Sequence, residues 1–352
     1  MTKPQILPTL RAPTYYIFYD SSSKYNYLVM ARELSEMSMV ERHEKWMTQY
    51  GRVYEDDAEK ARRFKIFASN VKLIDSFNAD SKNKYMLGTN QFADLTNDEF
   101  KATRTGLRRS TTSSSSSEFT TAEITNSFTY DNFSATPASM DWRMKGAVTP
   151  IKDQGQCGSC WAFSAVAAME GVTKLSNGKL VSLSEQELVD CDVNGVDQGC
   201  DGGLMDDAFD FIIKKGGLTT ESSYPYKGTD GTCKKSSSIA ATIKGYEDVP
   251  ANNEAALLKA VSNQPVSVAI EASGYAFQLY AGGIFTGNCG TDLDHGVTTV
   301  GYGTASDGTN YWLVKNSWGS AWGEKGYIRM ERDVKAKEGL CGIAMQASYP
   351  TA

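Results

Sequence analysis

The amino-acid sequence predicts an α+β fold with two lobes, a helical lobe over residues 136–247 and a β-rich lobe over residues 248–352. Three observations predict it. Apolar residues of the first region recur at helical spacing, and the second region holds short runs rich in Val, Ile, Tyr and Trp that Gly, Asn and Asp bound. A Ser-rich stretch separates this body from a small helical unit nearer the N-terminus. We therefore expect two packed lobes with a cleft between them.

Length and composition limit the kinds of partner. The chain has 352 residues, of which 41% are hydrophobic and 11% aromatic, enough for a sizeable folded core. The net charge is −6, the acidic surplus lies after residue 135 and no basic run occurs, so we expect no nucleic acid partner. No apolar stretch approaches the ~18 residues that span a bilayer, so we expect no membrane insertion.

Residues 1–36 lack a clear secretion signal. The apolar run Tyr15–Tyr19 is followed by Asp20 and polar residues, whereas a signal peptide has an apolar core of roughly 7–15 residues. We expect an N-terminal segment without a signal peptide, which conflicts with the disulfides inferred below.

Residues 37–102 predict a small helical unit. In the run Asp57–Asn78, apolar residues recur at spacings of three and four. Six positions of this run share one broad helix face: Glu59, Arg63, Phe67, Asn70, Ile74 and Asn78. An ordinary surface helix with ion pairs is the alternative. Four residues then recur at every second position, Gly88, Asn90, Phe92 and Asp94, and Thr96 with Glu99 matches a capping box that starts a short helix.

Residues 103–135 predict a linker. Thr103–Thr125 is of low complexity and includes five consecutive serines, Ser113–Ser117. Such a stretch cannot bury a core, and an exposed linker is a natural site of proteolysis.

The helical lobe carries a candidate reactive cysteine. Trp161–Glu170 is apolar and has no Pro or Gly, which predicts a buried helix starting at Cys160. The positive end of the helix dipole favours a thiolate there. Further helices are expected over Ser184–Asp190, where Ser184 and Glu187 match a capping box, and over Leu204–Lys215.

The cysteine count indicates disulfides. The chain has seven cysteines, none before Cys157, so six form three disulfides and one stays free if the compartment is oxidising. Six cysteines allow about 15 pairings. Seven reduced cysteines in a cytosolic protein are the alternative. Because Cys157-x-x-Cys160 has no second motif of its kind, we expect no zinc site, and we expect no cofactor.

The β-rich lobe supplies a candidate base. Strands are predicted over Val266–Ile270, Gly296–Tyr302, Tyr311–Lys315 and Gly326–Met330. The only histidines are His43 and His295, and His295 enters the second of these strands. A thiol nucleophile needs a base and an orienting group, for which Asn316 is placed after the third strand. The side chain of Gln154 and the Cys160 N–H are candidate oxyanion donors. A purely structural His295 is the alternative.

Gln154-Gly155-Gln156-Cys157-Gly158-Ser159-Cys160-Trp161 resembles the active-site motif of papain-like cysteine proteases, with His and Asn at the expected distances. The resemblance covers residues 31–352. Both N-terminal motifs resemble the propeptide motifs of the cathepsin L-like branch, and the details resemble plant senescence-associated members. The resemblance implies a zymogen of a cysteine endopeptidase: residues 37–102 form an inhibitory propeptide that runs through the cleft against the substrate direction, 103–135 the activation region, and the β-rich lobe a barrel.

The resemblance also implies roles for single residues. Cys160 is the nucleophile, His295 the base and Asn316 its orienting group, while Gln154 completes the oxyanion hole and Trp318 covers the Asn–His contact. The substrate-binding residues implied are Gly202 and Gly203 for the substrate backbone, Leu204, Met205, Ala269, Leu293 and Gln346 for the pocket of the second residue before the cut (P2), and Asp294 and Trp318. The apolar walls imply a preference for a bulky apolar P2 residue. The implied disulfides are Cys157–Cys200, Cys191–Cys233 and Cys289–Cys341.

Further expectations concern maturation and partners. We expect acid to release the propeptide by protonating ion-paired carboxylates such as Asp94, with a cut near Asn132–Thr136. Asn132 begins a glycosylation sequon. The resemblance implies a vacuolar, lysosomal or extracellular monomer that acts on protein and peptide substrates and is inhibited by its propeptide and by cystatin-like proteins. The rivals are a thioredoxin-like disulfide exchanger and a catalytically inactive homologue.

Overall fold

A computed structural model describes residues 37–108, 128–133, 135–234 and 238–352. The chain divides into two compact units, Met1–Lys60 and Ala61–Ala352. The expected N-terminal segment 1–36 and most of the expected linker lie outside the described residues.

The first unit contains helix α2 (Met39–Tyr50). A capping box starts it, because Ser38 Oγ accepts from the Glu41 N–H and the Glu41 carboxylate accepts from the Ser38 N–H at 2.8 Å. His43 is buried and stacks on the rings of Trp46 and Tyr54, at centroid distances of 5.9 and 6.0 Å. This histidine therefore has a structural environment of its own.

Helix α3 (Asp57–Asn78) begins in the first unit, with Glu59 in its first turn, and ends in the second. In the second unit, three residues of the predicted helix face are buried: Phe67, Asn70 and Ile74. Asn70 Nδ2 donates to the carbonyls of Ala93 and Leu95 at 2.9 and 3.0 Å. Asn78 likewise exchanges hydrogen bonds with both backbone groups of Leu87, which lies in strand β1 (Tyr85–Leu87). The amides at helical spacing thus hold a mostly irregular segment against α3.

Helix α4 (Asn97–Arg104) starts with the predicted capping box of Thr96 and Glu99. It extends past residue 102, so the first residues of the expected linker are helical.

The helical lobe consists of α5 (Cys160–Asn177), α6 (Glu185–Cys191), the 3₁₀ turn η1 (Gly199–Asp201) and α7 (Met205–Lys215). Helix α5 is buried along most of its length and packs on α7 and on the sheet. Ser184 caps α6 as predicted, but the capping box is incomplete. The Glu187 carboxylate instead accepts from the Thr219 N–H at 2.8 Å and pairs with Lys215 at 2.8 Å.

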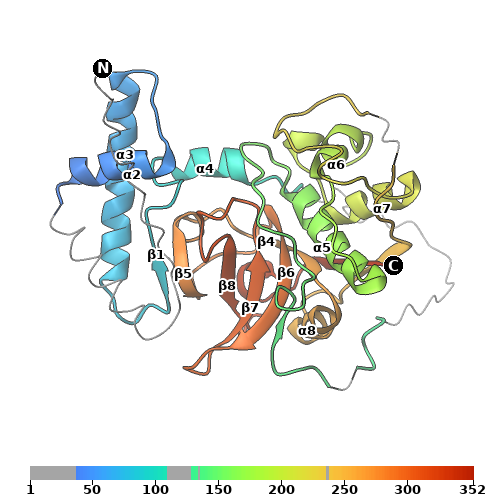
Figure 1. Ribbon diagram of the computed structural model, residues 1–352. Coiled ribbons are helices and arrows are strands. Elements are labelled where there is room, and N and C mark those ends of the chain that lie inside the picture. Colours follow the sequence, from blue (N-terminus) through green and yellow to red (C-terminus); the bar gives the residue numbers. More distant parts are fainter. Residues whose placement is uncertain (1–36, 109–127, 134, 235–237) are drawn as a thin grey trace, which may run out of the picture. The chain divides into compact units, whose positions relative to one another are not determined.

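The second lobe is a mixed sheet with three short helices, α8 (Glu254–Asn263), α9 (Tyr275–Gln278) and η2 (Leu340–Gly342). Its strands are β2 (Met140–Asp141), β3 (Gly245–Asp248), β4 (Val266–Ile270), β5 (Tyr280–Phe285), β6 (His295–Thr304), β7 (Asn310–Lys315), β8 (Tyr327–Glu331) and β9 (Ala347–Thr351). The strand order is β1-β5-β8-β7-β6-β4-β9-β3, and β2 pairs with β6. All pairs are antiparallel except β5 with β8. The expected α+β class is confirmed (Figure 1).

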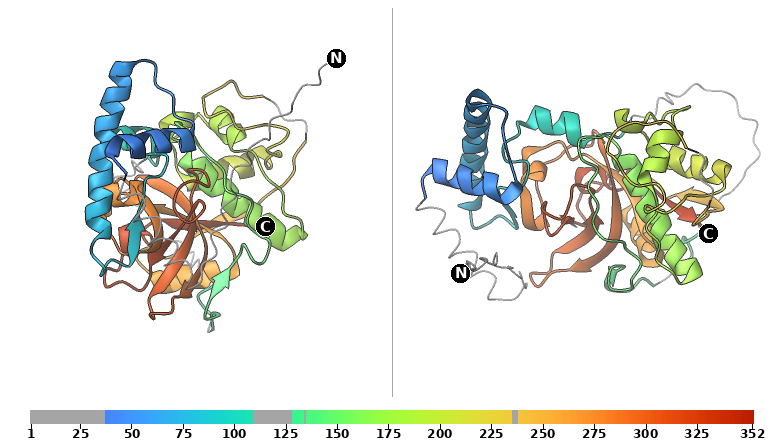
Figure 2. Two further views of the ribbon diagram at one scale, coloured as in Figure 1. Left: turned by 60° about the vertical axis from the view of Figure 1, so that its left-hand side comes forward. Right: turned by 45° about the horizontal axis from the view of Figure 1, so that its top comes forward.

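Three strands cross the expected domain boundaries, one of them β3, which starts at Gly245 within the expected helical lobe and pairs with β9. Strand β1 lies before the body in sequence yet pairs with β5, with Tyr85 opposite Gly283. Strand β2, expected in the helical lobe, pairs with β6. Figure 2 shows α5 and the sheet it packs against from two further directions.

Three disulfides are present, Cys157–Cys200, Cys191–Cys233 and Cys289–Cys341, and Cys160 is the free cysteine. These are the pairs that the resemblance implies. Within the described ranges, no helix has both the length and the apolar character needed to cross a bilayer. The same ranges contain no cluster of three His, Cys, Asp or Glu residues able to hold a metal ion.

Candidate active site

Cys160 is the first residue of α5 and lies where that helix meets β6. Its side chain is fully buried, and Sγ accepts from the Gly296 N–H at 3.4 Å. The preceding Ser159 does not cap the helix. Its hydroxyl instead bonds the Tyr226 hydroxyl at 2.7 Å. Ser159 therefore does not compete with the Cys160 thiol for the N–H groups at the start of α5.

His295, at the start of β6, faces a fixed acceptor. Its Nε2 lies 2.8 Å from Oδ1 of Asn316, which also accepts from the Ser317 N–H at 2.8 Å. An amide oxygen only accepts, so Nε2 carries the proton of the neutral ring. Trp318 stacks on the imidazole at a centroid distance of 4.5 Å. Nδ1 is buried without a hydrogen-bond partner among the described residues, which leaves it available to the thiol.

Gln154 is buried with its amide held at both ends. Oε1 accepts from Ser317 Oγ at 2.6 Å, and Nε2 donates to the Cys157 carbonyl at 2.9 Å. Ser317 therefore holds Asn316 through its N–H and Gln154 through its hydroxyl. Sequence reasoning missed Ser317, and its only signal was its position next to Asn316.

Residues 104–108, which we call the covering segment, run through the cleft. The N–H groups of Gly106 and Leu107 donate to the Asp294 carbonyl at 3.1 and 3.0 Å. Gly203 donates to the Gly106 carbonyl at 3.0 Å, and its own carbonyl accepts from Arg108 at 3.0 Å. Leu107 and Gly203 form a parallel bridge. The sequence placed this segment in a flexible linker, because carbonyl partners this distant in sequence leave no local signal.

The covering segment approaches the backbone beneath it closely. A Cβ placed on Gly106 would lie 2.0 Å from the Gly158 carbonyl oxygen. Only glycine fits such a distance, so Gly106 is required by the close approach.

Burial determines the protonation states of Cys160 and His295 while the covering segment is in place. It raises the pKa of Cys160 to about 12, against the N–H groups of Gly296, Trp161 and Gly106 that face the sulfur. Burial also lowers the pKa of His295 to about 4, although the Asn316 hydrogen bond opposes it. Both groups are therefore neutral at pH 7. The expected depression of the thiol pKa is wrong for the covered state, because desolvation outweighs the helix dipole.

Leu107 contacts several of the expected substrate-binding residues, because its N–H donates to the Asp294 carbonyl and its backbone bridges that of Gly203. Its side chain packs on an apolar cluster that includes Met205 and Ala269, with Leu293 packed against the same cluster. Gly202, Gly203 and Leu204 are buried. Gln346 is half-buried, and its backbone carbonyl accepts from the Ala269 N–H at 2.9 Å. Asp294 is half-buried, and burial raises its pKa to about 6.

Trp318 also contacts residues of the motif at positions 88–94. The edges of Phe92 and Phe100 meet its ring at centroid distances of 5.9 and 5.1 Å. Gln91 Nε2 donates to the Trp318 carbonyl at 2.6 Å, and Asn90 Nδ2 donates to the Gln278 carbonyl at 2.8 Å. These contacts therefore hold residues 88–94 against the β-rich lobe beside the site.

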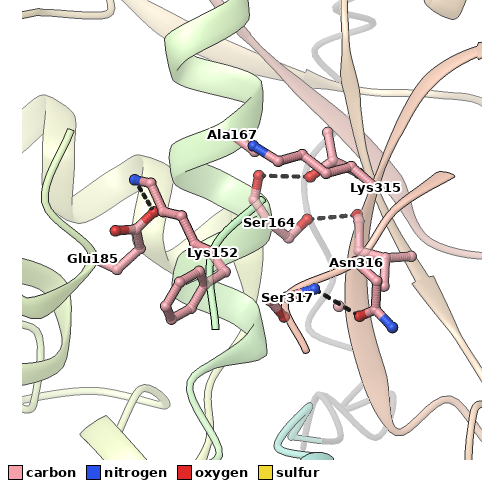
Figure 3. Close-up of a pocket in the computed structure, with 11 residues that line it drawn as sticks. Lys152, Ser164, Ala167, Glu185, Lys315, Asn316 and Ser317 are labelled. Carbon is pink, nitrogen blue, oxygen red and sulfur yellow. Dashed lines mark hydrogen bonds and ion pairs between the residues drawn. The ribbon is translucent and has the colours of Figure 1, made fainter. Parts of the chain in front are cut away.

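A buried charged network lies beneath the site, beside a cavity of about 10 Å³ (Figure 3). Lys152 Nζ contacts Glu170 at 3.1 Å and Glu185 at 2.6 Å. Thr149 Oγ1 accepts from Lys315 Nζ at 2.8 Å and donates to Glu170 at 2.6 Å. Figure 3 shows Lys152 next to Glu185 on the left of the view, with Lys315 and Asn316 on the right. The network joins α5, α6 and β7, and sequence reasoning missed it.

Comparison with known families agrees with this arrangement. Residues 136–351 match the papain family of cysteine proteases, and residues 43–100 match the cathepsin propeptide inhibitor domain. The chain belongs to the papain family. It is a cysteine protease with a propeptide inhibitor domain, and the covering segment begins shortly after residue 100, the last residue matched to that domain.

Named relatives of this papain-family chain include a senescence-specific cysteine protease of Oryza sativa subsp. indica, 65% identical over 330 residues that cover 92% of this chain and 94% of the relative. Among solved structures, recombinant stem bromelain precursor is 48% identical with a TM-score of 0.80, over 89% of this chain and 98% of that one. The proform of the ragweed pollen allergen Amb a 11 is 42% identical with a TM-score of 0.80, over 91% and 97%.

The disulfide pattern argues against the redox rival. Cys157 is bonded to Cys200 and not to Cys160, so the C-x-x-C motif is no redox pair in this papain-family protein.

Proposed function

We propose that the chain is the zymogen of an endopeptidase in which Cys160 is the nucleophile, His295 the base and acid, Asn316 the orienting group and Gln154 an oxyanion donor. The observation that carries the proposal is the convergence of a free thiol at a helix start, an imidazole with an open Nδ1 and a fixed amide at its Nε2. The covering segment over these groups supports the zymogen state.

The chemistry follows from these positions once the covering segment leaves. Water and the helix N-terminus then favour transfer of the Cys160 proton to His295 Nδ1. The thiolate attacks the peptide carbonyl carbon, and the Cys160 N–H and Gln154 Nε2 stabilise the oxyanion. The imidazolium protonates the leaving amine, which leaves a thioester. His295 then deprotonates a water that hydrolyses the thioester and frees the thiol.

The central test uses the full chain with an added signal peptide, acid treatment and a fluorogenic dipeptide substrate. We expect hydrolysis after processing, loss of activity in Cys160→Ser, and iodoacetamide labelling of one thiol that abolishes activity. An acid-processed protein that hydrolyses no substrate would contradict the proposal, as would activity retained in Cys160→Ser.

The P2 preference is proposed from the occupant of the pocket. Leu107 packs on the cluster of Met205 and Ala269, which supports a bulky apolar P2 residue. Gln346 is proposed at the pocket floor, where it shortens the pocket or admits polar groups. Profiling peptides that vary only at P2 checks this: Gln346→Ala is expected to change the preference, and an unchanged profile would remove Gln346 from the pocket.

Acid activation is proposed from the Arg63–Glu99 contact between α3 and α4. Arg63 Nη1 donates to the Asp94 carbonyl at 3.0 Å and to the Glu99 carboxylate at 2.8 Å. Burial favours a raised pKa for Glu99, but hydrogen bonds from Thr96 and Arg63 outweigh it and hold the pKa below its usual value. A lowered pKa gives stability that is present above the unfolded-state pKa and is lost as pH falls through the folded-state pKa. Glu99 therefore supports the acid-release proposal more directly than Asp94.

Compartment, modification and partners are proposed together. Three disulfides and acid release fit a vacuole or lysosome reached through the secretory pathway, or secretion. Asn132 is exposed, as a glycosylated side chain must be, and lies beside the proposed cut near Asn132–Thr136. We propose a monomer that cystatin-like proteins inhibit. A glycosidase-sensitive mass shift absent in Asn132→Gln would support passage through the secretory pathway.

A further inference from the structure

The side chain of Arg104 lies in a small site formed by Asp153, Gly155 and Phe92, which we call the seat. Its Nη1 donates to the Gly155 carbonyl and lies 3.8 Å from Asp153 Oδ1. The guanidinium lies over the Phe92 ring at 4.8 Å. Only 11% of the Arg104 side chain is exposed, against 56% of the Asp153 side chain. An arginine is therefore largely buried against an acidic residue that otherwise faces solvent.

The register of the covering segment locates this seat relative to the thiol. Leu107 packs on the apolar cluster that contains Met205 and Ala269 of the proposed P2 pocket, and Gly106 lies against Gly158, close to Cys160. The Arg104 carbonyl lies 3.4 Å from Gln154 Nε2 and 3.2 Å from Trp318 Nε1. Arg104 is thus on the other side of Cys160 from Leu107, where residues after the scissile bond would bind.

Contacts within the protease body hold Asp153 and Gly155 in position. The Gly155 N–H donates to Asp153 Oδ1 at 2.9 Å, and the backbone of Asp153 bridges that of Trp318. The neighbouring Lys152 does not neutralise the carboxylate, because its Nζ is committed to Glu170 and Glu185 in the buried network. The seat therefore offers a carboxylate and a carbonyl, two acceptors suited to a cation.

We propose that Asp153 and the Gly155 carbonyl form a subsite that favours Arg or Lys in one of the first two substrate residues after the cut. This inference rests on the proposed function. Phe92 leaves with the propeptide, so the mature subsite keeps only the ion pair and the hydrogen bond. Exposed ion pairs contribute about 0.2–1 kcal/mol, which corresponds to a preference of roughly 1.4- to 5-fold.

Internally quenched peptides test the subsite in the acid-processed enzyme. Each peptide has Leu at P2, and Arg is compared with Gln at the first and then at the second position after the cut. The measured quantity is the ratio of kcat/KM for the Arg peptide to that for the Gln peptide, in the parent, in Asp153→Asn and in Asp201→Asn. Asp201 is a matched control, because it is exposed and adjoins Gly202 on the other side of the thiol.

We expect a ratio of about 1.4 to 5 at one position in the parent and in Asp201→Asn, falling to about one in Asp153→Asn. Added salt should reduce the parent ratio, because the pair is exposed. A parent that cleaves the Gln peptide without preferring Arg would overturn the subsite alone, as would an equal ratio in Asp153→Asn. Failure to cleave any peptide would instead overturn the proposed function.

Discussion

At Cys160, two physical effects on the thiol pKa act in opposite directions. The N-terminus of α5 and three N–H groups favour the thiolate, while complete burial favours the neutral thiol, and burial prevails. The same desolvation keeps His295 neutral. Covering the site therefore does more than exclude substrate, because it also withholds the ion pair that the chemistry requires.

Gln154→Ala tests the oxyanion role at the residue scale. The Nε2 donor disappears, so we expect kcat of the processed enzyme to fall by roughly 100- to 1000-fold with a small change in KM. Steady-state kinetics on the dipeptide substrate measures it. The exposed Gln156, changed to Ala, is the control and should keep parental kcat. A rise in KM with kcat unchanged would assign Gln154 to ground-state binding instead.

At the scale of helices and strands, the sequence pattern predicted those elements whose formation depends on neighbouring residues in the sequence. The start of α5, the ends of α3 and strand β4 match the sequence prediction, because amphipathic spacing and β-branched runs are local signals. The pairing of β1 with β5 and the path of the covering segment were not predictable in this way. Both depend on hydrogen bonds between residues far apart in sequence. Within the site, the motif around Cys160 indicated the chemical groups, whereas Ser317 and the buried network emerge only from packing.

The segment from Asp192 to Leu204 contains a pair of carboxyl groups, of which Asp197 is buried and Asp192 half-buried. Asp197 shares a hydrogen bond with Asp192 and accepts from the Leu204 N–H at 2.7 Å. Burial raises the pKa of both Asp197 and Asp192, and Asp207, Asp210 and Lys214 are the other charged groups that act on the pair. This pair thus binds more protons in the folded protein than in the unfolded chain from about pH 4 upward, so its contribution to the free energy of unfolding falls as pH rises above that value.

Asp197→Asn should flatten this dependence. An amide accepts from Leu204 and donates to Asp192 at any pH, so Tm should fall less between pH 5 and pH 8 than in the parent. Thermal melts in the Cys160→Ser background avoid self-digestion, and Asp201→Asn serves as the exposed control. Parallel Tm profiles for Asp197→Asn and the parent would remove the pair as a source of pH dependence.

At the scale of the whole molecule, inhibition depends on how closely the covering segment approaches the cleft. Gly106→Ala places a methyl group against the Gly158 carbonyl, and overpacking of this kind costs about 1–3 kcal/mol. We expect the segment to be held about 5- to 150-fold more weakly, giving activity in unprocessed protein at neutral pH. Thr105→Ala, whose side-chain bond to the Lys101 carbonyl is exposed, should stay inactive. A silent Gly106→Ala zymogen with normal processed activity would contradict the close-approach argument.

Glu99→Gln tests acid release at the same scale. Gln keeps the size of the side chain but removes the charge that pairs with Arg63, so activation should occur at higher pH than in the parent. Activity after incubation across a pH series measures the midpoint. Asp98→Asn changes an exposed carboxylate in the first turn of the same helix and should leave the midpoint in place. Equal midpoints for Glu99→Gln and the parent would assign the trigger to other groups.

The scarcity of histidine has a spectroscopic consequence. Of the two imidazoles in the chain, His43 lies within the part expected to be removed, so a processed enzyme would carry His295 alone. The ring of Trp318 stacks on it at 4.5 Å, which should displace its proton resonances by ring current from those of an exposed histidine. A single, shifted imidazole signal would then report protonation of the base directly, without isotopic editing or mutation.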